Sequence, residues 1–209
     1  MTVRRIGLLG GSFDPPHLAH LALGRLARDA LALDELRWLP AGTPWQKAAR
    51  ARAPAAHRRA MLAALLDGEP RCVLDERELQ RPGLTYTIDT VRALQAEQPG
   101  AEWFLVIGQD QYARFDTWRD WPELLQRLTL AVAGRAGTAP LAPAALAGHP
   151  HRVVALDLPR LDIAATDIRR RLAAGEPALS LAPLVGPAVA RYIDQHRLYT
   201  PSPKEDSRR

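Results

Sequence analysis

Short apolar runs alternate along the chain with longer segments in which apolar residues recur every three or four positions. The runs have strand length and cover residues 5–9, 35–39, 71–74, 103–107, 128–133 and 152–156. The longer segments have helical spacing and cover residues 18–33, 55–66, 88–98, 111–127 (a broken stretch), 166–174 and 187–196. This alternation is typical of a parallel sheet with helices on both faces. It predicts an α/β fold, a doubly wound parallel sheet of about six strands followed by C-terminal helices.

The length and composition of the chain fit one globular unit. It has 209 residues, of which 47% are hydrophobic and 24% are charged, enough to bury one sizeable core. We expect a single domain over residues 1–199 and a polar, disordered tail over residues 200–209. Residues 134–150 are rich in Ala, Pro and Gly, which predicts a surface loop. Charged residues or prolines interrupt every apolar run before the roughly 18 residues of a membrane span, so no span is expected.

Charge, cysteine content and the N-terminus bear on location and partners. The N-terminal apolar run is too short for a signal peptide, because Gly10, Gly11 and Asp14 interrupt it. The single cysteine, Cys72, cannot form an intramolecular disulfide, so we expect a buried thiol in a cytoplasmic protein. The 28 Lys and Arg against 23 Asp and Glu give a net charge of +5, with the basic residues scattered along the chain. Nucleic acid is therefore not an expected partner, whereas a nucleotide needs only a few cations.

The first predicted strand runs into residues 10–20, which read G-G-S-F-D-P-P-H-L-A-H. In a parallel α/β sheet, ligands bind at such a turn, at the carboxyl end of a strand. Gly10 and Gly11 let the backbone approach a ligand closely, and the helix that begins at about His17 presents free N–H groups to an anion. His17 and His20 are three residues apart and share one face of the first helical turn. The motif therefore predicts a phosphate site contacted by both imidazoles.

Other phosphate-binding and catalytic motifs do not fit this turn. It has neither the G-x-x-x-x-G-K-[ST] loop of ATPases nor the G-x-G-x-x-G turn that binds dinucleotides. It also lacks the closing glycine of a hydrolase nucleophile elbow, so Ser12 is a weak candidate for a nucleophile. A zinc site at the two histidines would need further ligands, of which only Asp14 is near in sequence. An isolated histidine pair is more often structural, but the preceding glycines favour a phosphate site.

A second anion site is predicted at the start of the helical segment over residues 166–174. Arg169 follows Thr166 by three residues, so the helix dipole, a hydroxyl and a guanidinium converge on one anion. An ordinary capped helix with an exposed arginine is the alternative.

Lys47 lies in a proline-containing loop after the second predicted strand and could supply another cation, although a lone lysine is more often solvated.

Several segments resemble one known family. Residues 10–20 are similar to the H-x-G-H signature of a nucleotidyltransferase superfamily, in which two histidines bind the phosphates of ATP. Further similar segments follow in order at residues 39–47, 85–90, 107–110 with Trp118 after them, 163–169 and 192–199. Together they resemble bacterial nicotinate-nucleotide adenylyltransferases over roughly residues 5–199. The resemblance implies a Rossmann-like fold.

The resemblance also implies a reaction. The adenylyl group of ATP is transferred to nicotinate mononucleotide, which gives nicotinate adenine dinucleotide and pyrophosphate in NAD biosynthesis. The partners are then ATP and nicotinate mononucleotide, with Mg²⁺ carried by the ATP phosphates and no metal ligands in the protein. Because the attacking phosphate is already ionised, catalysis rests on positioning and charge stabilisation, without a general base or covalent intermediate. The expected catalytic residues are His17, His20, Lys47 and Arg169.

The resemblance assigns binding roles as well. Backbone N–H groups at residues 85–87 and the ring of Trp118 are implied to hold the pyridine and its carboxylate, with a place in the core as the alternative for Trp118. Asp110 is implied to bind a sugar hydroxyl, with a helix cap as its alternative. The expected binding residues are Gly10, Gly11, Ser12, Phe13, Thr85, Tyr86, Thr87, Gly108, Asp110, Trp118, Thr166 and Ile168.

Two other functions stay open at this point. The same fold could transfer a nucleotidyl group to another phosphate, such as nicotinamide mononucleotide or phosphopantetheine. A non-catalytic nucleotide- or RNA-binding relative is the second alternative, since the charge balance is basic and Ala164 and Ala165 stand where the family has two serines. Ala19 stands where the family has a glycine, which bears on substrate affinity. Residue types set neither the oligomeric state nor the preference between nicotinate and nicotinamide, because backbone N–H groups that read a carboxylate leave no trace in the sequence.

Overall fold

A six-stranded parallel sheet forms the centre of the computed structural model, which describes residues 3–44, 53–134, 137–159 and 161–200. The strand order is β4-β2-β1-β6-β7-β8. The strands are β1 (Arg5–Gly11), β2 (Glu35–Pro40), β4 (Cys72–Leu74), β6 (Glu102–Gly108), β7 (Thr129–Gly134) and β8 (Arg152–Asp157). Each predicted strand is confirmed, with ends that differ by one or two residues. The order reverses between β1 and β6, which makes their carboxyl ends the topological switch point where ligands bind.

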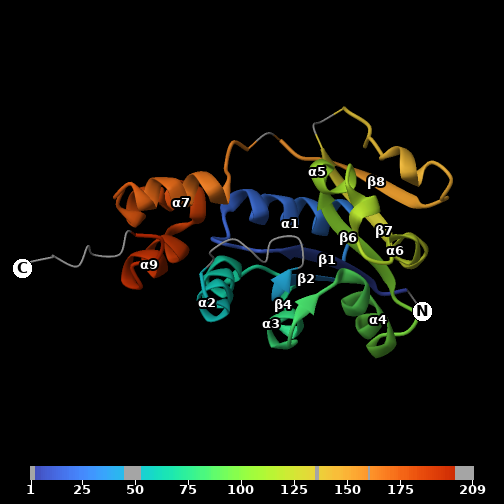
Figure 1. The fold of residues 1–209 in the computed structure, drawn as a ribbon, viewed down its shortest axis with the longest axis horizontal. Coiled ribbons are helices and arrows are strands. Elements are labelled where there is room, and N and C mark those ends of the chain that lie inside the picture. Colours follow the sequence, from blue (N-terminus) through green and yellow to red (C-terminus); the bar gives the residue numbers. More distant parts are fainter. Residues whose placement is uncertain (1–2, 45–52, 135–136, 160, 201–209) are drawn as a thin grey trace, which may run out of the picture.

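Helices cover both faces of this sheet, which confirms the doubly wound arrangement (Figure 1). One face carries α1 (Leu18–Ala30), α2 (Ala55–Leu66), α7 (Ala165–Ala173) and α9 (Pro187–Gln195), and the other carries α4 (Thr87–Glu97) and α6 (Trp121–Arg127). Successive residues of a strand point to opposite faces, so Leu8 joins the core under α4 and Leu9 joins the core under α1. Because both faces are buried, the strands read as continuous apolar runs rather than as an alternating pattern.

The first helix is shorter than its apolar spacing predicts. It ends at Ala30, and the chain turns through Ala32 at a φ of 47°. Leu31 and Leu33 pack into the core from this turn, so apolar spacing continues past the last helical residue. The break predicted within residues 111–127 is confirmed, because α5 (Gln109–Tyr112), η1 (Phe115–Thr117) and α6 follow one another there.

Several short elements escape the periodicity analysis because each spans too few residues to show a repeat. Strands β3 (Thr43–Pro44) and β5 (Leu84–Thr85) form a second, two-stranded parallel sheet beside the carboxyl edge of the main one. The other short elements are α3 (Arg77–Gln80), η2 (Ala144–Leu146), η3 (Ala178–Leu181) and α8 (Ala182–Val185). In the predicted loop at 134–150, η2 buries the side chain of Leu146 and so fixes the described part of that loop to the core.

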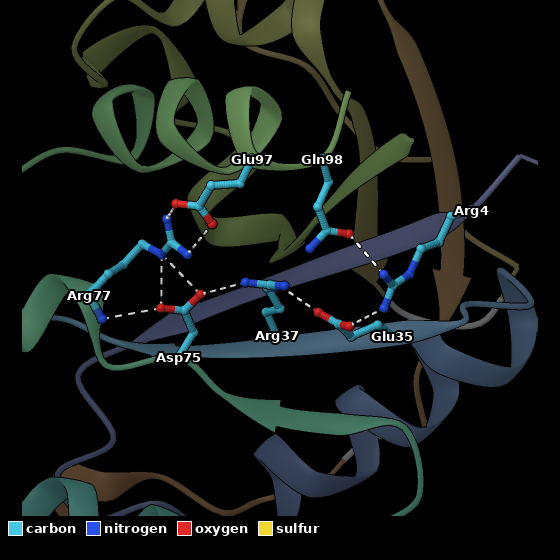
Figure 2. A network of polar contacts seen from close by, with 7 residues as sticks. All are labelled: Arg4, Glu35, Arg37, Asp75, Arg77, Glu97 and Gln98. Atoms are coloured by element: carbon cyan, nitrogen blue, oxygen red, sulfur yellow. Dashed lines mark hydrogen bonds and ion pairs between the residues drawn. The ribbon is translucent and has the colours of Figure 1, made fainter. Parts of the chain in front are cut away.

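An ion-pair network ties β2 to the segment that follows β4 and to α4 (Figure 2). Arg37 on β2 bridges Glu35 and Asp75 at 2.5 and 3.0 Å. Arg77 then bridges Asp75 and Glu97, donating to each through two contacts of 2.9 and 3.0 Å. Since Arg77 begins α3, the network holds α3 and the end of α4 against the sheet.

Three predictions from the sequence concern membrane spans, the single cysteine and the C-terminal tail. Among the residues that the structure describes, no helix is long and apolar enough to cross a membrane. Cys72 is half-buried in β4 and is not in a disulfide. The tail predicted over residues 200–209 lies, except for Thr200, outside the described residues, and its disorder stays a prediction.

Candidate active site

A cavity of about 160 Å³ opens at the carboxyl edge of the sheet, at the switch point between β1 and β6. Its walls come from the end of β1, the chain after β2, strand β6, and the segment that includes α3 and the start of α4. Residues with predicted binding roles line it: Gly10, Gly11, Ser12, Thr85, Thr87 and Trp118. The fold thus brings the first glycine motif and the predicted pyridine-binding segment to one cavity.

The two histidines of the motif stand together at the start of α1. Their rings stack with centroids 3.6 Å apart, as expected for residues on one face of the first turn. The backbone N–H of His17 donates to Nδ1 of His20 at 3.2 Å. An accepting Nδ1 places the proton of a neutral His20 on Nε2, where it is available to a ligand.

Burial keeps this histidine pair neutral at physiological pH. It lowers the pKa of His17 to about 4. Burial also lowers the pKa of His20, and the neighbouring His17 lowers it further. The pair therefore meets an anion as hydrogen-bond donors rather than as two cations. Nδ1 of His17 is buried and has no hydrogen-bond partner among the described residues.

Phe13 packs against the histidine pair from the core. Its side chain is buried, and its ring packs edge-on against His20 with centroids 5.1 Å apart. A Cβ on Gly11 would lie 3.0 Å from the Phe13 ring, so the close approach of backbone and ring favours glycine there. The structure places the Phe13 side chain in the core under the site, and its predicted contact with substrate would have to come from the backbone.

Asp14 connects the glycine motif to distant parts of the chain. It is only 3% exposed, and its Oδ1 accepts hydrogen bonds from the Tyr199 hydroxyl at 2.7 Å and from the Ala53 N–H at 3.2 Å. The backbone carbonyl of Asp14 accepts a hydrogen bond from Nη1 of Arg169 at 2.5 Å. Arg169 also donates to Oγ1 of Thr166 at 3.2 Å. The predicted second anion site on α7 thus lies against the first one.

Arg58 is a buried residue of α2 that sequence reasoning missed. Its guanidinium donates to the carbonyls of Ser12 at 3.0 Å, Ala41 at 2.7 Å and Ala53 at 3.2 Å. It therefore holds together the chain segments that leave β1 and β2. An arginine on the same face of the helix as Met61 and Leu65 is the signal that could have revealed it.

The other side of the cavity carries polar atoms that face no protein partner. Within the described part of the chain, Oγ1 of Thr85 and Nε1 of Trp118 are buried without a hydrogen bond. Trp118 stacks on Phe115, with centroids 5.2 Å apart, and also lines the cavity. Trp118 therefore packs on the core, as the alternative prediction for it stated, and lines the cavity as well. Tyr86 instead contacts Arg119, whose guanidinium lies 4.5 Å from the ring centre.

Glu78 and Thr90 complete this wall, and neither was predicted. The Thr90 hydroxyl is fully buried and donates to Oε1 of Glu78 at 2.9 Å, while Arg81 donates to the same hydroxyl at 3.4 Å. Burial raises the pKa of Glu78, and the hydrogen bond from Thr90 opposes this in part. A carboxyl inside a predicted anion pocket is thus shifted toward its neutral form.

Comparison with known proteins places this arrangement in a family. The model of the cytidylyltransferase-like family matches residues 8–171. A protein of Methylibium petroleiphilum named probable nicotinate-nucleotide adenylyltransferase is 54% identical over 95% of this chain and 93% of its own length. One of the same name from Bordetella petrii is 48% identical over 94% of this chain and its own full length.

The chain belongs to the nicotinate-nucleotide adenylyltransferase family. The family predicted from the motifs is thereby confirmed. A solved nicotinic acid mononucleotide adenylyltransferase of Plasmodium falciparum, in complex with NaAD, has the same fold with a TM-score of 0.76. It is 16% identical and the match covers 94% of this chain and 97% of that one, so the similarity concerns the fold.

The residues that line the cavity of this adenylyltransferase include neither the predicted catalytic residues His17, His20 and Arg169 nor the predicted binding residues Ile168 and Asp110. Ile168 is buried in the core, and its N–H donates to the carbonyl of Ala164, the residue before α7, so its contact with substrate stays a prediction. Asp110 is exposed at the start of α5 and accepts a hydrogen bond from the Gln111 side chain at 3.0 Å. Gln111 lines the cavity and Asp110 does not.

Gly108 caps α5, and a Cβ there would lie 2.7 Å from Oδ1 of Asp110, so glycine makes room for the aspartate. Lys47 lies outside the described residues, as do Trp45 and Gln46. Among the residues that the structure does describe, no group of three or more His, Cys, Asp or Glu side chains could hold a metal ion.

Proposed function

We propose that this adenylyltransferase joins the adenylyl group of ATP to nicotinate mononucleotide and releases pyrophosphate. The observation that carries the proposal is that the motif residues lining the cavity with Trp118 lead directly into the neutral histidine pair at the start of α1. Arg169 is held to the same segment through the Asp14 carbonyl. The names of the relatives support the same reaction.

The transfer is an in-line displacement at phosphorus. An ionised oxygen of the mononucleotide phosphate attacks the α-phosphorus, the bond to the β-phosphate oxygen breaks, and pyrophosphate leaves with its electron pair. Mg²⁺ enters as part of the MgATP substrate. His17 and His20 donate hydrogen bonds to the phosphates, and Arg169 and Lys47 supply positive charge. Loss of either imidazole should lower turnover about a hundredfold, or roughly 3 kcal/mol.

The cavity supports nicotinate rather than nicotinamide as the acceptor ring. A carboxylate only accepts hydrogen bonds, and the unpartnered Nε1 of Trp118 and Oγ1 of Thr85 can both donate. An amide offers one acceptor oxygen and two N–H donors, and of these two protein groups only the Thr85 hydroxyl can accept a hydrogen bond from an N–H. The indole of Trp118 offers a flat surface on which a pyridine ring can stack.

The test is pyrophosphate release in the presence of MgATP, with nicotinate mononucleotide, nicotinamide mononucleotide and phosphopantetheine compared at equal concentrations. Strong preference for the nicotinate form is expected. Release with another acceptor alone would keep the chemistry and change the substrate, and no release with any acceptor would refute the proposal. We also propose a cytoplasmic location, which the unpaired Cys72 supports.

A further inference from the structure

The C-terminal end of the described chain reaches the glycine motif. The Tyr199 hydroxyl donates to Oδ1 of Asp14 at 2.7 Å, across 185 positions of sequence. The Tyr199 side chain packs against the core cluster that includes Leu9 and Phe13. Burial and the neighbouring Asp14 raise the pKa of Tyr199, so the hydroxyl keeps its proton and stays a donor at physiological pH.

The Asp14 carboxylate lies between this hydroxyl and the cation of the second anion site. Its Oδ1 accepts the hydrogen bonds from Tyr199 and Ala53, whereas its Oδ2 lies 4.0 Å from Nη1 of Arg169. A distance of 4.0 Å is the outer limit of an ion pair, and the same Nη1 donates to the Asp14 carbonyl instead. The carboxylate is thus held by its other oxygen while the guanidinium is not closely paired with it.

This arrangement leaves the guanidinium available. A carboxylate and an arginine that meet freely form a close, bidentate pair, which is stronger than a single neutral contact. Such a pair would neutralise Arg169 and turn it away from a phosphate. The hydrogen bond from Tyr199 opposes that collapse because it fixes the direction in which the Asp14 carboxylate faces.

We infer that Tyr199 is a positioning residue of the adenylyl-transfer site: its hydroxyl holds the Asp14 carboxylate so that the glycine motif keeps its shape and Arg169 stays directed at the substrate phosphates. The inference rests on the proposed function in one respect, since it takes Arg169 as a ligand of the ATP phosphates. Tyr199 itself does not contact the substrate and acts through Asp14 and Arg169.

The test is Tyr199→Phe, with Tyr192→Phe as the matched control. Both changes remove one tyrosine hydroxyl near the C-terminus, and the Tyr192 hydroxyl lies 3.1 Å from Nδ1 of His57, between α9 and α2. Thermal melting, kcat, the KM for ATP and the Kd of a non-hydrolysable ATP analogue are measured for both. Loss of a hydrogen bond to a charged group predicts about a tenfold lower kcat and a weaker Kd for Tyr199→Phe. Tyr192→Phe should lower the melting temperature similarly and keep kcat within about twofold of the parent.

A double-mutant cycle with Asp14→Asn separates positioning from general stability. If Tyr199 acts through Asp14, the double variant should lose no more activity than Asp14→Asn alone. Additive losses, or equal behaviour of the Tyr199 and Tyr192 variants in both kcat and Kd, would overturn the inference. Should the parent enzyme show no pyrophosphate release with nicotinate mononucleotide, the proposed function fails, while the Kd comparison still decides the role of Tyr199.

Discussion

Titration of His17 links the stability of this enzyme to the chemistry of its proposed phosphate site. Burial lowers the pKa of His17 from an ordinary value of 6.5 to about 4. Each unit of difference between the folded and unfolded states corresponds to about 1.4 kcal/mol, so the 2.5 units correspond to about 3 kcal/mol. Because the folded-state pKa is the lower one, this stability is fully present above pH 6.5 and is lost as the pH falls toward 4.

The change to make is His17→Gln, which keeps a polar side chain and removes the titration. Urea unfolding of the parent and the variant is measured at pH 7.5 and pH 4.5, with the free energy of unfolding extrapolated to water. Between these values the parent should lose about 2.5 kcal/mol more than the variant. Other groups titrate in both proteins and cancel in the comparison, except His20. Since His17 also lowers the pKa of His20, the measured difference should be no smaller than this value.

Parallel loss of stability in the two proteins would refute the reasoning. It would mean that His17 has an ordinary pKa and carries a substantial positive charge below neutral pH. The histidine pair would then bind phosphate by charge rather than by neutral hydrogen bonds, and the phosphate site would work differently from the one proposed.

Three further outcomes are expected. Trp118→Phe keeps an aromatic ring but removes the indole N–H, and steady-state kinetics should show about a tenfold higher KM for nicotinate mononucleotide with the KM for ATP unchanged. Arg58→Met leaves buried carbonyls without donors and should lower the free energy of unfolding in urea by about 3 kcal/mol. As the control, Arg59→Met should lower it by less than about 1 kcal/mol, because the Arg59 side chain is half-exposed and makes one ion pair with Glu76. Glu78→Gln removes a carboxyl whose pKa is raised by burial. Because ionisation of Glu78 destabilises only the parent, the melting temperature of the variant should increase relative to that of the parent as the pH rises from 5 to 8. A difference in melting temperature that stays constant with pH would contradict the raised pKa.

Apolar spacing was enough to predict the main elements because each strand and long helix must bury a face against the same core. The strands of both sheet halves and helices α1, α2, α4, α7 and α9 are long enough to show that spacing. The two-stranded sheet of β3 and β5 is not, since each strand covers two residues and is held by pairing with the other. The end of α1 was misplaced because Leu33 is as buried in a turn as it would be in a helix.

The same distinction holds within the site. Gly11, His17 and His20 lie within one short segment, so the local geometry of a strand, a turn and a helix start is sufficient to bring them together. The sequence alone therefore determined the family and the class of reaction, and it predicted the phosphate motif. Residues whose role depends on such local geometry can be recognised from their spacing.

Only the tertiary structure decided which distant residues complete the site. Tyr199 meets Asp14, Arg58 holds the turns after two strands, and Glu78 faces the cavity beside Thr90, although nothing in their spacing links them to the motif. It also decided that the two histidines are neutral, since the loss of water around a ring depends on everything packed against it. Contacts and desolvation arise between segments that are far apart in the chain, and a pattern along one sequence carries no distance between them.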